Sequence, residues 1–253
     1  MNAVPYCGPA PVPHDIIATW NFDPVLLASM AAILAGHLAL MRRTTADPKA
    51  RMAPAALAWI LLAILFVSPL CALSSALFSA RVFHHVVLTA VIAPLIVLSL
   101  PGLARASDAA KERLTLVFLG HTAILWLWHL PQPYAAALSS DLLYWAMQAS
   151  LLGSALLLWW CLLREGPMLP RMTVALGSVI QMGLLGALIT FARAPLYAAH
   201  AGVTEPWGLT QLDDQQLAGL IMWVPAALPY LAAALVLVGR TLSTASVSRT
   251  DPV

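Results

Sequence analysis

Seven uninterrupted apolar runs of about twenty residues each constrain this chain more than any other feature of its sequence. A helix of that length crosses the roughly 30 Å hydrocarbon layer of a bilayer at about 1.5 Å per residue. A membrane β-barrel would instead show alternating segments of about ten residues. The runs therefore predict an all-α integral membrane bundle of about seven transmembrane helices, at residues 25–41, 54–73, 82–100, 114–130, 142–163, 172–192 and 217–239.

Composition supports a membrane protein and leaves little room for a soluble domain. Hydrophobic residues make up 61% of the 253 residues and charged residues 9%, whereas a soluble domain is about one quarter charged. We divide the chain into an N-terminal tail (1–24), a seven-helix transmembrane domain (25–242) and a Ser/Thr-rich tail expected to be disordered (243–253). The basic residues are spread along the chain and do not form a patch, so nucleic acid is not an expected partner.

The distribution of lysine and arginine predicts the orientation of the bundle. Positive residues concentrate in loops on the cytoplasmic side of membrane proteins. The predicted helices place Arg81 and Arg193 on one side. They place eleven basic residues on the other, namely Arg42, Arg43, Lys49, Arg51, Arg105, Lys111, Arg113, Arg164, Arg171, Arg240 and Arg249. We therefore predict an outer N-terminus and a cytoplasmic C-terminus in a multi-pass protein of the bacterial inner (plasma) membrane.

This orientation brings several polar residues from distant parts of the chain to the outer membrane face. His84 and His85 open the third predicted helix, His129 closes the fourth, and Asp213 and Asp214 begin the seventh, with Asp213 three residues after Thr210 in a pattern close to a capping box. Ionisable groups in membrane segments are costly and tend to mark functional sites. The histidines have an alternative role as interfacial anchors, and the aspartates have one as caps of a helix N-terminus. His37 and His121 lie deeper, and His121 is expected to act in packing.

The three cysteines, Cys7, Cys71 and Cys161, are scattered without a Cys-x-x-Cys pair. This argues against a thioredoxin-like redox role or a thiolate metal site. We interpret Cys71 and Cys161 as small buried apolar residues. Cys7 lies in the outer tail, where it could pair with a partner protein.

Imidazole together with thioether sulfur suits copper better than zinc, and Met222 lies in the outer half of the last predicted helix. The candidate metal ligands are therefore His84, His85, His129, Asp213, Asp214 and Met222. Two histidines on facing helices could alternatively hold a haem iron. The sequence shows no nucleophile–histidine–carboxylate spacing and no phosphate-binding glycine loop, so we do not expect an enzyme.

Three segments resemble the CtaG-type cytochrome c oxidase assembly proteins. The first is residues 77–88 (LFSARVFHHVVL) followed by 93–95 (APL). The second is residues 127–131 (LWHLP) followed by 134–138 (YAAAL), and the third is residues 212–225 (LDDQQLAGLIMWVP). Two positions depart from the commoner pattern of the family. The histidines that open the third helix are often four residues apart but are adjacent here, and Met147 and Gln148 replace a Glu-His pair.

The resemblance implies an assembly factor for a haem–copper cytochrome c oxidase that assists copper delivery to the catalytic subunit at the outer membrane face. Copper would be bound transiently, and the implied partners are that subunit, a periplasmic copper chaperone and the lipid bilayer. Two alternatives remain open. One is a metal-free membrane scaffold for oxidase subunits, and the other is a haem-binding membrane protein.

Overall fold

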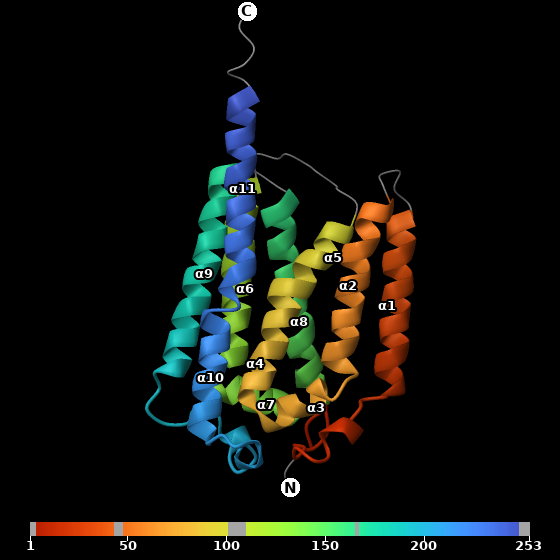
Figure 1. Cartoon of the computed structure of the whole chain (residues 1–253), viewed down its shortest axis with the longest axis vertical. Coiled ribbons are helices and arrows are strands. Elements are labelled where there is room, and N and C mark those ends of the chain that lie inside the picture. The colour runs from red at the N-terminus through yellow and green to blue at the C-terminus, as the bar shows by residue number, and fades with distance from the viewer. Residues whose placement is uncertain (1–3, 43–47, 101–109, 165–166, 248–253) are drawn as a thin grey trace, which may run out of the picture.

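The apolar runs form helices that stand side by side in one bundle (Figure 1). The computed structural model describes residues 4–42, 48–100, 110–164 and 167–247, and within these ranges it contains no strand. By length and composition, five helices can cross a membrane, or up to seven if each of two bent helix pairs counts as one span. The predicted all-α membrane class is confirmed, and the orientation of the termini stays a prediction.

The main helical segments follow the predicted runs. In chain order they are α1 (Pro24–Arg42), α2 (Pro48–Phe66), α3 (Leu70–Ala76), α4 (Phe78–Val86), the π-helical η2 (Val87–Ile92), α5 (Ala93–Ser99), α6 (Ala110–His129), α7 (Pro131–Leu138), α8 (Asp141–Arg164), α9 (Met168–Thr190), α10 (Gln211–Trp223) and α11 (Ala227–Val247). The segments α4, η2 and α5 together form one span.

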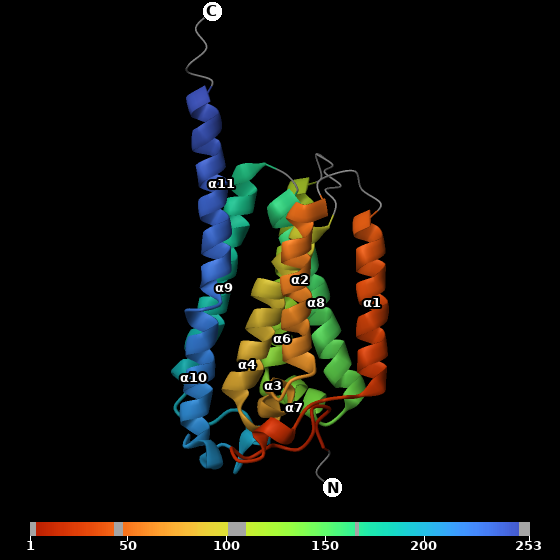
Figure 2. The same ribbon diagram turned by 45° about the vertical axis from the view of Figure 1, so that its right-hand side comes forward.

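One end of the bundle gathers residues 4–23, α3, α7 and the loop 191–210, while α11 ends at the opposite end (Figures 1 and 2). We call the first of these the N-terminal end. Its parts are tied together across the chain, because the Trp207 indole donates to the Pro11 carbonyl at 3.1 Å. The Asn21 side chain likewise donates to the Phe66 carbonyl at the end of α2, at 3.2 Å.

One predicted span is bent where the sequence appeared continuous, and another is followed by a further short helix at a sharp angle. The axis turns by 47° between α2 and α3, and by 71° between α6 and α7. Pro69 precedes α3 and has no N–H to continue the hydrogen bonding of α2. Leu130 has an extended backbone ahead of Pro131, as residues before proline prefer. The predicted run 54–73 is therefore corrected to two helices, and α7 is a helix that hydropathy did not predict.

The last predicted helix also differs in its bounds. It begins at Gln211 and not at residue 217, because Thr210 caps its N-terminus. It is interrupted around Pro225 and resumes as α11, which continues to Val247. Residues 243–247 of the tail expected to be disordered are therefore helical, and residues 248–253 lie outside the described part of the chain.

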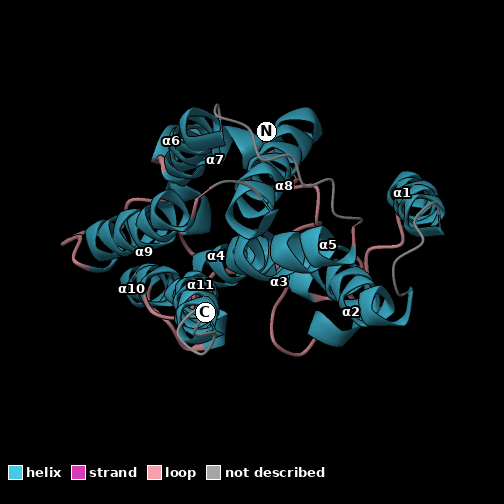
Figure 3. Cartoon of the chain, turned by 90° about the horizontal axis from the view of Figure 1, so that it is seen from above, coloured by secondary structure: helices cyan, strands magenta, loops and turns pink. Residues whose placement is uncertain are grey.

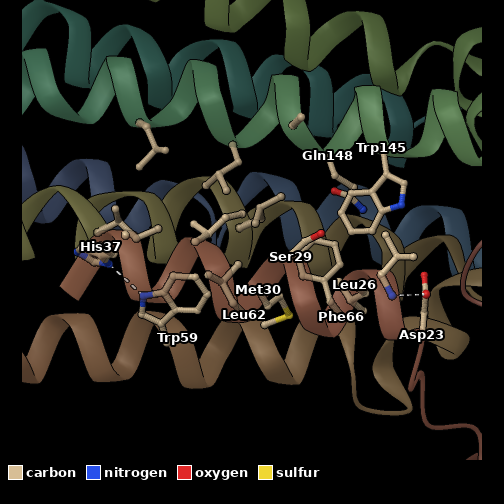
Figure 4. Close-up of a pocket in the computed structure, with 18 of the residues that line it drawn as sticks. Asp23, Leu26, Ser29, Met30, His37, Trp59, Leu62, Phe66, Trp145 and Gln148 are labelled. Carbon is tan, nitrogen blue, oxygen red and sulfur yellow. Dashed lines mark hydrogen bonds between the residues drawn. The ribbon is translucent and has the colours of Figure 1, made fainter. Parts of the chain in front are cut away.

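Helix α1 stands apart from the other helices (Figures 2 and 3). A cavity of about 810 Å³ lies between α1 and the facing sides of α2, α5 and α8. Most of the side chains that line it are apolar (Figure 4). Near one end of the cavity, His37 accepts a hydrogen bond from the Trp59 indole at 3.0 Å and bonds Ser99 Oγ at 2.9 Å.

Helices α9 and α10 approach closely at two glycines, as small residues allow in membrane bundles. A Cβ at Gly219 would lie 2.7 Å from the Thr190 amide nitrogen and 2.5 Å from the Gly186 carbonyl oxygen. Backbone atoms cannot yield locally, so we expect Gly219→Ala to destabilise the protein by about 1–3 kcal/mol. Gly120→Ala is the control, because a Cβ there meets nothing within 4 Å. Thermal unfolding in detergent would measure both, and equal midpoints would contradict this packing.

Candidate functional site

Helix α4 places three polar side chains in the interior near the N-terminal end. Arg81, His84 and His85 are three and four residues apart, so they share one helical face. Their exposed fractions are 0%, 0% and 1%. Helix α4 packs against α10, and its continuation η2 packs against α8, so α4 lies in the middle of the bundle (Figure 3).

His129 ends α6 and faces His85. The centroids of the two rings are 5.5 Å apart, and the ring planes are nearly perpendicular. His129 Nδ1 donates to the Leu125 carbonyl at 2.7 Å, which leaves Nε2 as a nitrogen with a free lone pair. This backbone bond fixes the tautomer in the way that supports histidine ligands of metals.

Three of the four ring nitrogens of this pair have no partner among the described residues. His85 Nδ1, His85 Nε2 and His129 Nε2 are all buried without a hydrogen bond. Two imidazoles that hold one ion from opposite sides, with metal–nitrogen bonds of about 2 Å, have centroids about 6 Å apart. The observed separation of 5.5 Å is close to that value, so the two rings are near enough to share one ion.

His84 is held differently from His85. Its Nε2 lies 3.4 Å from the Gln148 amide nitrogen on α8, and its ring meets the Phe66 ring edge-on at 4.9 Å. Because the amide donates to Nε2, the ring proton resides on Nδ1. His84 is therefore engaged by α8 and α2. Its ring also lies beside that of His85, with centroids 6.0 Å apart and planes at 89°, but its only nitrogen without a partner among the described residues, Nδ1, carries the ring proton.

The two aspartates cap helices, which was the alternative that the sequence left open. Asp214 accepts hydrogen bonds from the backbone N–H groups of Phe78 and Ser79, at 2.7 and 3.1 Å, and from the Ser79 hydroxyl. It therefore caps α4 from α10. Asp213 forms a capping box with Thr210 at the start of its own helix. Neither carboxylate is directed to the histidine pair by these bonds.

Met222 on α10 and Met147 on α8 are fully buried in the apolar core that also contains Val82 and Val86 of α4. Their sulfur atoms are thus shielded from solvent within the same bundle interior as the histidines. Met222 as a metal ligand stays a prediction. Among the described residues, no group of three or more histidine, cysteine or carboxylate side chains is arranged to hold a metal ion.

The remaining buried histidines have structural bonds. His121 Nδ1 bonds Ser154 Oγ on α8 at 2.9 Å, as expected for a packing residue between helices. His200, in the short helix η3 (Ala198–His200), bonds the Tyr134 hydroxyl at 2.7 Å and the Ala76 carbonyl at 3.1 Å. It therefore joins the loop 191–210 to α7 and α3.

His200 should make stability sensitive to acid. Burial lowers its pKa from the usual value of 6.5 to about 4. The unfolded chain therefore binds this proton more tightly, and stability falls as pH drops from 6.5 toward 4, by up to about 1.4 kcal/mol per pH unit. We expect His200→Gln to lose less stability than the wild type between pH 7 and 5 in thermal unfolding. The other buried histidines remain in both proteins. If the unfolding temperatures of the two proteins fall equally between pH 7 and 5, this effect of His200 on stability is contradicted.

The cysteine interpretation requires a correction. Cys7 and Cys71 form a disulfide that ties the N-terminal tail to α3, with Cα atoms 5.2 Å apart. Cys71 is therefore not an isolated apolar residue, and Cys7 finds its partner within the chain. Cys161 is buried in the core, as expected. Sequence spacing gave no signal for the disulfide, because 64 positions separate the two cysteines.

Arg81 is a site residue that the charge analysis overlooked. It was counted as a loop charge at the outer face, yet it lies inside α4 with 0% exposure. The centre of its guanidinium is 5.3 Å from the centroid of the Tyr144 ring. Its spacing of three and four residues from His84 and His85 was the available signal.

Fold and site together define an all-helical protein with membrane-spanning helices and a buried pair of histidines near one end. The model of the cytochrome c oxidase caa3 assembly factor family (Caa3_CtaG) matches residues 31–244, and the chain belongs to this family. The family is one of cytochrome c oxidase assembly factors, in agreement with the resemblance of the three sequence motifs. No curated protein and no solved structure matches the chain.

Proposed function

We propose that this protein assists copper delivery to the catalytic subunit of a cytochrome c oxidase, by holding Cu(I) transiently between His85 and His129. The observation that carries the proposal is the facing pair of buried rings, 5.5 Å apart, with three ring nitrogens that have no protein partner. Cu(I) accepts low coordination numbers and imidazole or thioether ligands. The role is that of a carrier and not of an enzyme.

A two-ligand site suits cargo that must be passed on. The described residues provide no preformed set of three charged or imidazole ligands, so the ion would be held less firmly than in a structural metal site. Burial of both rings protects the bound ion from water and competing ligands. Met222 would complete the site from α10 if the helices shift when copper binds.

The membrane face also belongs to the proposal. We place the N-terminal end on the periplasmic side of the bacterial inner membrane, where the loops carry few basic residues. The disulfide supports this side, because disulfides persist in the periplasm and are rare in the cytosol. The catalytic subunit and a periplasmic copper chaperone are the proposed partners.

The haem-binding alternative has less support from the described residues. The cavity beside α1 has one histidine, His37, in its lining (Figure 4). Both nitrogens of His37 are already hydrogen-bonded. The metal-free scaffold remains the competing function. It predicts that the free nitrogens of His85 and His129 are dispensable.

A strain that lacks this protein tests the function directly. We expect it to assemble little active cytochrome c oxidase in copper-poor medium and to recover partly when copper is added. Activity should be measured with oxidase subunit levels by immunoblot, because a missing scaffold would lower the subunits themselves. If oxidase activity is lost and added copper does not restore it, the scaffold function is favoured over copper delivery.

A further inference from the structure

Arg81 carries a positive charge into the interior of the bundle without a visible counter-charge. Its guanidinium stays protonated in proteins. Its side chain is 0% exposed, and Nε, Nη1 and Nη2 all lack a hydrogen-bond acceptor among the described residues. Buried charges are normally paired because an isolated one is very costly. The Tyr134 and Tyr144 hydroxyls are close enough to interact with the guanidinium, but both groups are neutral, so no described side chain beside Arg81 balances its charge.

The side chains around Arg81 cannot supply a negative charge. The centroid of the Tyr144 ring lies 5.3 Å from the guanidinium. The arginine is also close enough to interact electrostatically with Tyr134, His84, His85 and His200. Phenols and imidazoles are not anionic at neutral pH. A cation over the face of Tyr144 gains a cation–π attraction, but this does not neutralise the charge.

The carboxylate of Asp214 is committed elsewhere. Its two oxygens accept from the N–H groups of Phe78 and Ser79, which begin α4, and not from the Arg81 guanidinium. These bonds offset the positive end of the helix dipole. Arg81 lies in the first turn of the same helix, so the dipole adds to its positive potential.

Among the buried groups without a partner near Arg81 and His84, Gln148 Oε1 is an acceptor, and those of Arg81 and His84 themselves are donors. Besides the three guanidinium nitrogens, His84 Nδ1 is buried without a partner, and it carries the ring proton because Gln148 donates to Nε2. A set of donors beside a fixed positive charge favours an anion over a metal cation. The full enclosure of Arg81 limits the size of such an anion.

We propose that Arg81 and His84 Nδ1 bind a small monovalent anion of the halide class inside the bundle. The anion neutralises Arg81 and leaves the neighbouring His85–His129 pair free to accept a cation. Without it, Cu(I) would enter a buried site next to an uncompensated positive charge, and that repulsion is strong in a low-dielectric interior. The effect of the anion on Cu(I) binding rests on the proposed copper function, whereas the anion site itself does not depend on that function.

Chloride titration of the purified full-length protein tests the anion site. Starting in methanesulfonate buffer at fixed ionic strength, we expect saturable stabilisation, with a Tm rise of about 3–6 °C once chloride exceeds its Kd about tenfold. Arg81→Gln should lose the response and Arg81→Lys should keep part of it. Arg193→Gln is the control, because Arg193 is an exposed arginine at the same end of the bundle. A wild-type Tm that chloride does not change would overturn the proposal even if no Arg81 variant folds.

Copper affinity separates this inference from the proposed function. We expect the Kd for Cu(I), measured by competition with a chromogenic chelator, to tighten about tenfold or more as chloride replaces methanesulfonate. The chelator alone must be calibrated at each chloride concentration. Arg81→Gln should bind Cu(I) independently of chloride. If the wild type binds Cu(I) with a Kd that chloride does not change, only the effect of the anion on copper binding is contradicted. If it binds no Cu(I) at any chloride concentration, the copper function is contradicted.

Discussion

His129→Ala and His85→Ala are each expected to abolish maturation of cytochrome c oxidase in copper-poor medium, with partial recovery when copper is raised. Each variant removes one of the two proposed ligands, whose ring centroids are 5.5 Å apart. Changes even to residues behind metal ligands cost about 10–100-fold in affinity, so loss of a ligand should cost at least that much. Oxidase activity in membranes, measured across a range of added copper, gives the result.

His121→Ala is the matched control for these variants. It also removes a buried histidine from α6, about 12 Å below His129 by helical rise, but one that bonds Ser154. Its effect should follow the amount of protein in the membrane and should not respond to copper. If His129→Ala protein accumulates normally and matures oxidase like the wild type under copper limitation, the scaffold function is the better account.

Loss of the Cys7–Cys71 disulfide should have the largest effect on stability. The bond closes a loop with a sequence separation of 64, and crosslinks of this kind typically contribute about 2–4 kcal/mol. Cys7→Ala, Cys71→Ala and the double variant should therefore unfold at similar, clearly lower temperatures than the wild type. Thermal unfolding in detergent, with and without reductant, measures the difference.

The double variant also controls for other effects of reductant. Reductant should lower the unfolding temperature of the wild type and leave that of the double variant unchanged. Free-thiol labelling of the denatured wild type should modify Cys161 alone before reduction. Labelling of all three cysteines in protein purified without reductant would show that the disulfide does not form in the cell.

Hydropathy predicted the helices because the membrane selects for continuous apolar length. It did not predict the bend after α2 or the helix α7, since these depend on the local effects of Pro69 and Pro131 and not on average hydropathy. The early start of the last helix depends on a cap by Thr210. A polar first turn lowers hydropathy, so the apolar run begins only at residue 217, although the spacing of Thr210 and Asp213 already indicated a helix start.

The site was partly predictable for a similar reason. Depth in the membrane brought His84, His85 and His129 to the same end, but it could not say which rings face each other. That selection comes from the bond of Gln148 on α8 to His84 and from the bond of His129 to the Leu125 carbonyl one turn earlier in α6, which fixes the His129 tautomer. Arg81 was counted with the loop charges because its burial depends on how α4 packs. The disulfide and the capping role of Asp214 join residues far apart in the chain.

Copper content of the purified protein tests the central claim most directly. After loading with Cu(I) under anaerobic conditions and removal of unbound metal, elemental analysis should find one copper per chain in the wild type. The same ratio is expected for Asp213→Asn, whose carboxylate caps α10. The double variant His85→Ala/His129→Ala should retain none. Copper bound equally by the double variant, or none bound by the wild type, would contradict a copper site at His85 and His129.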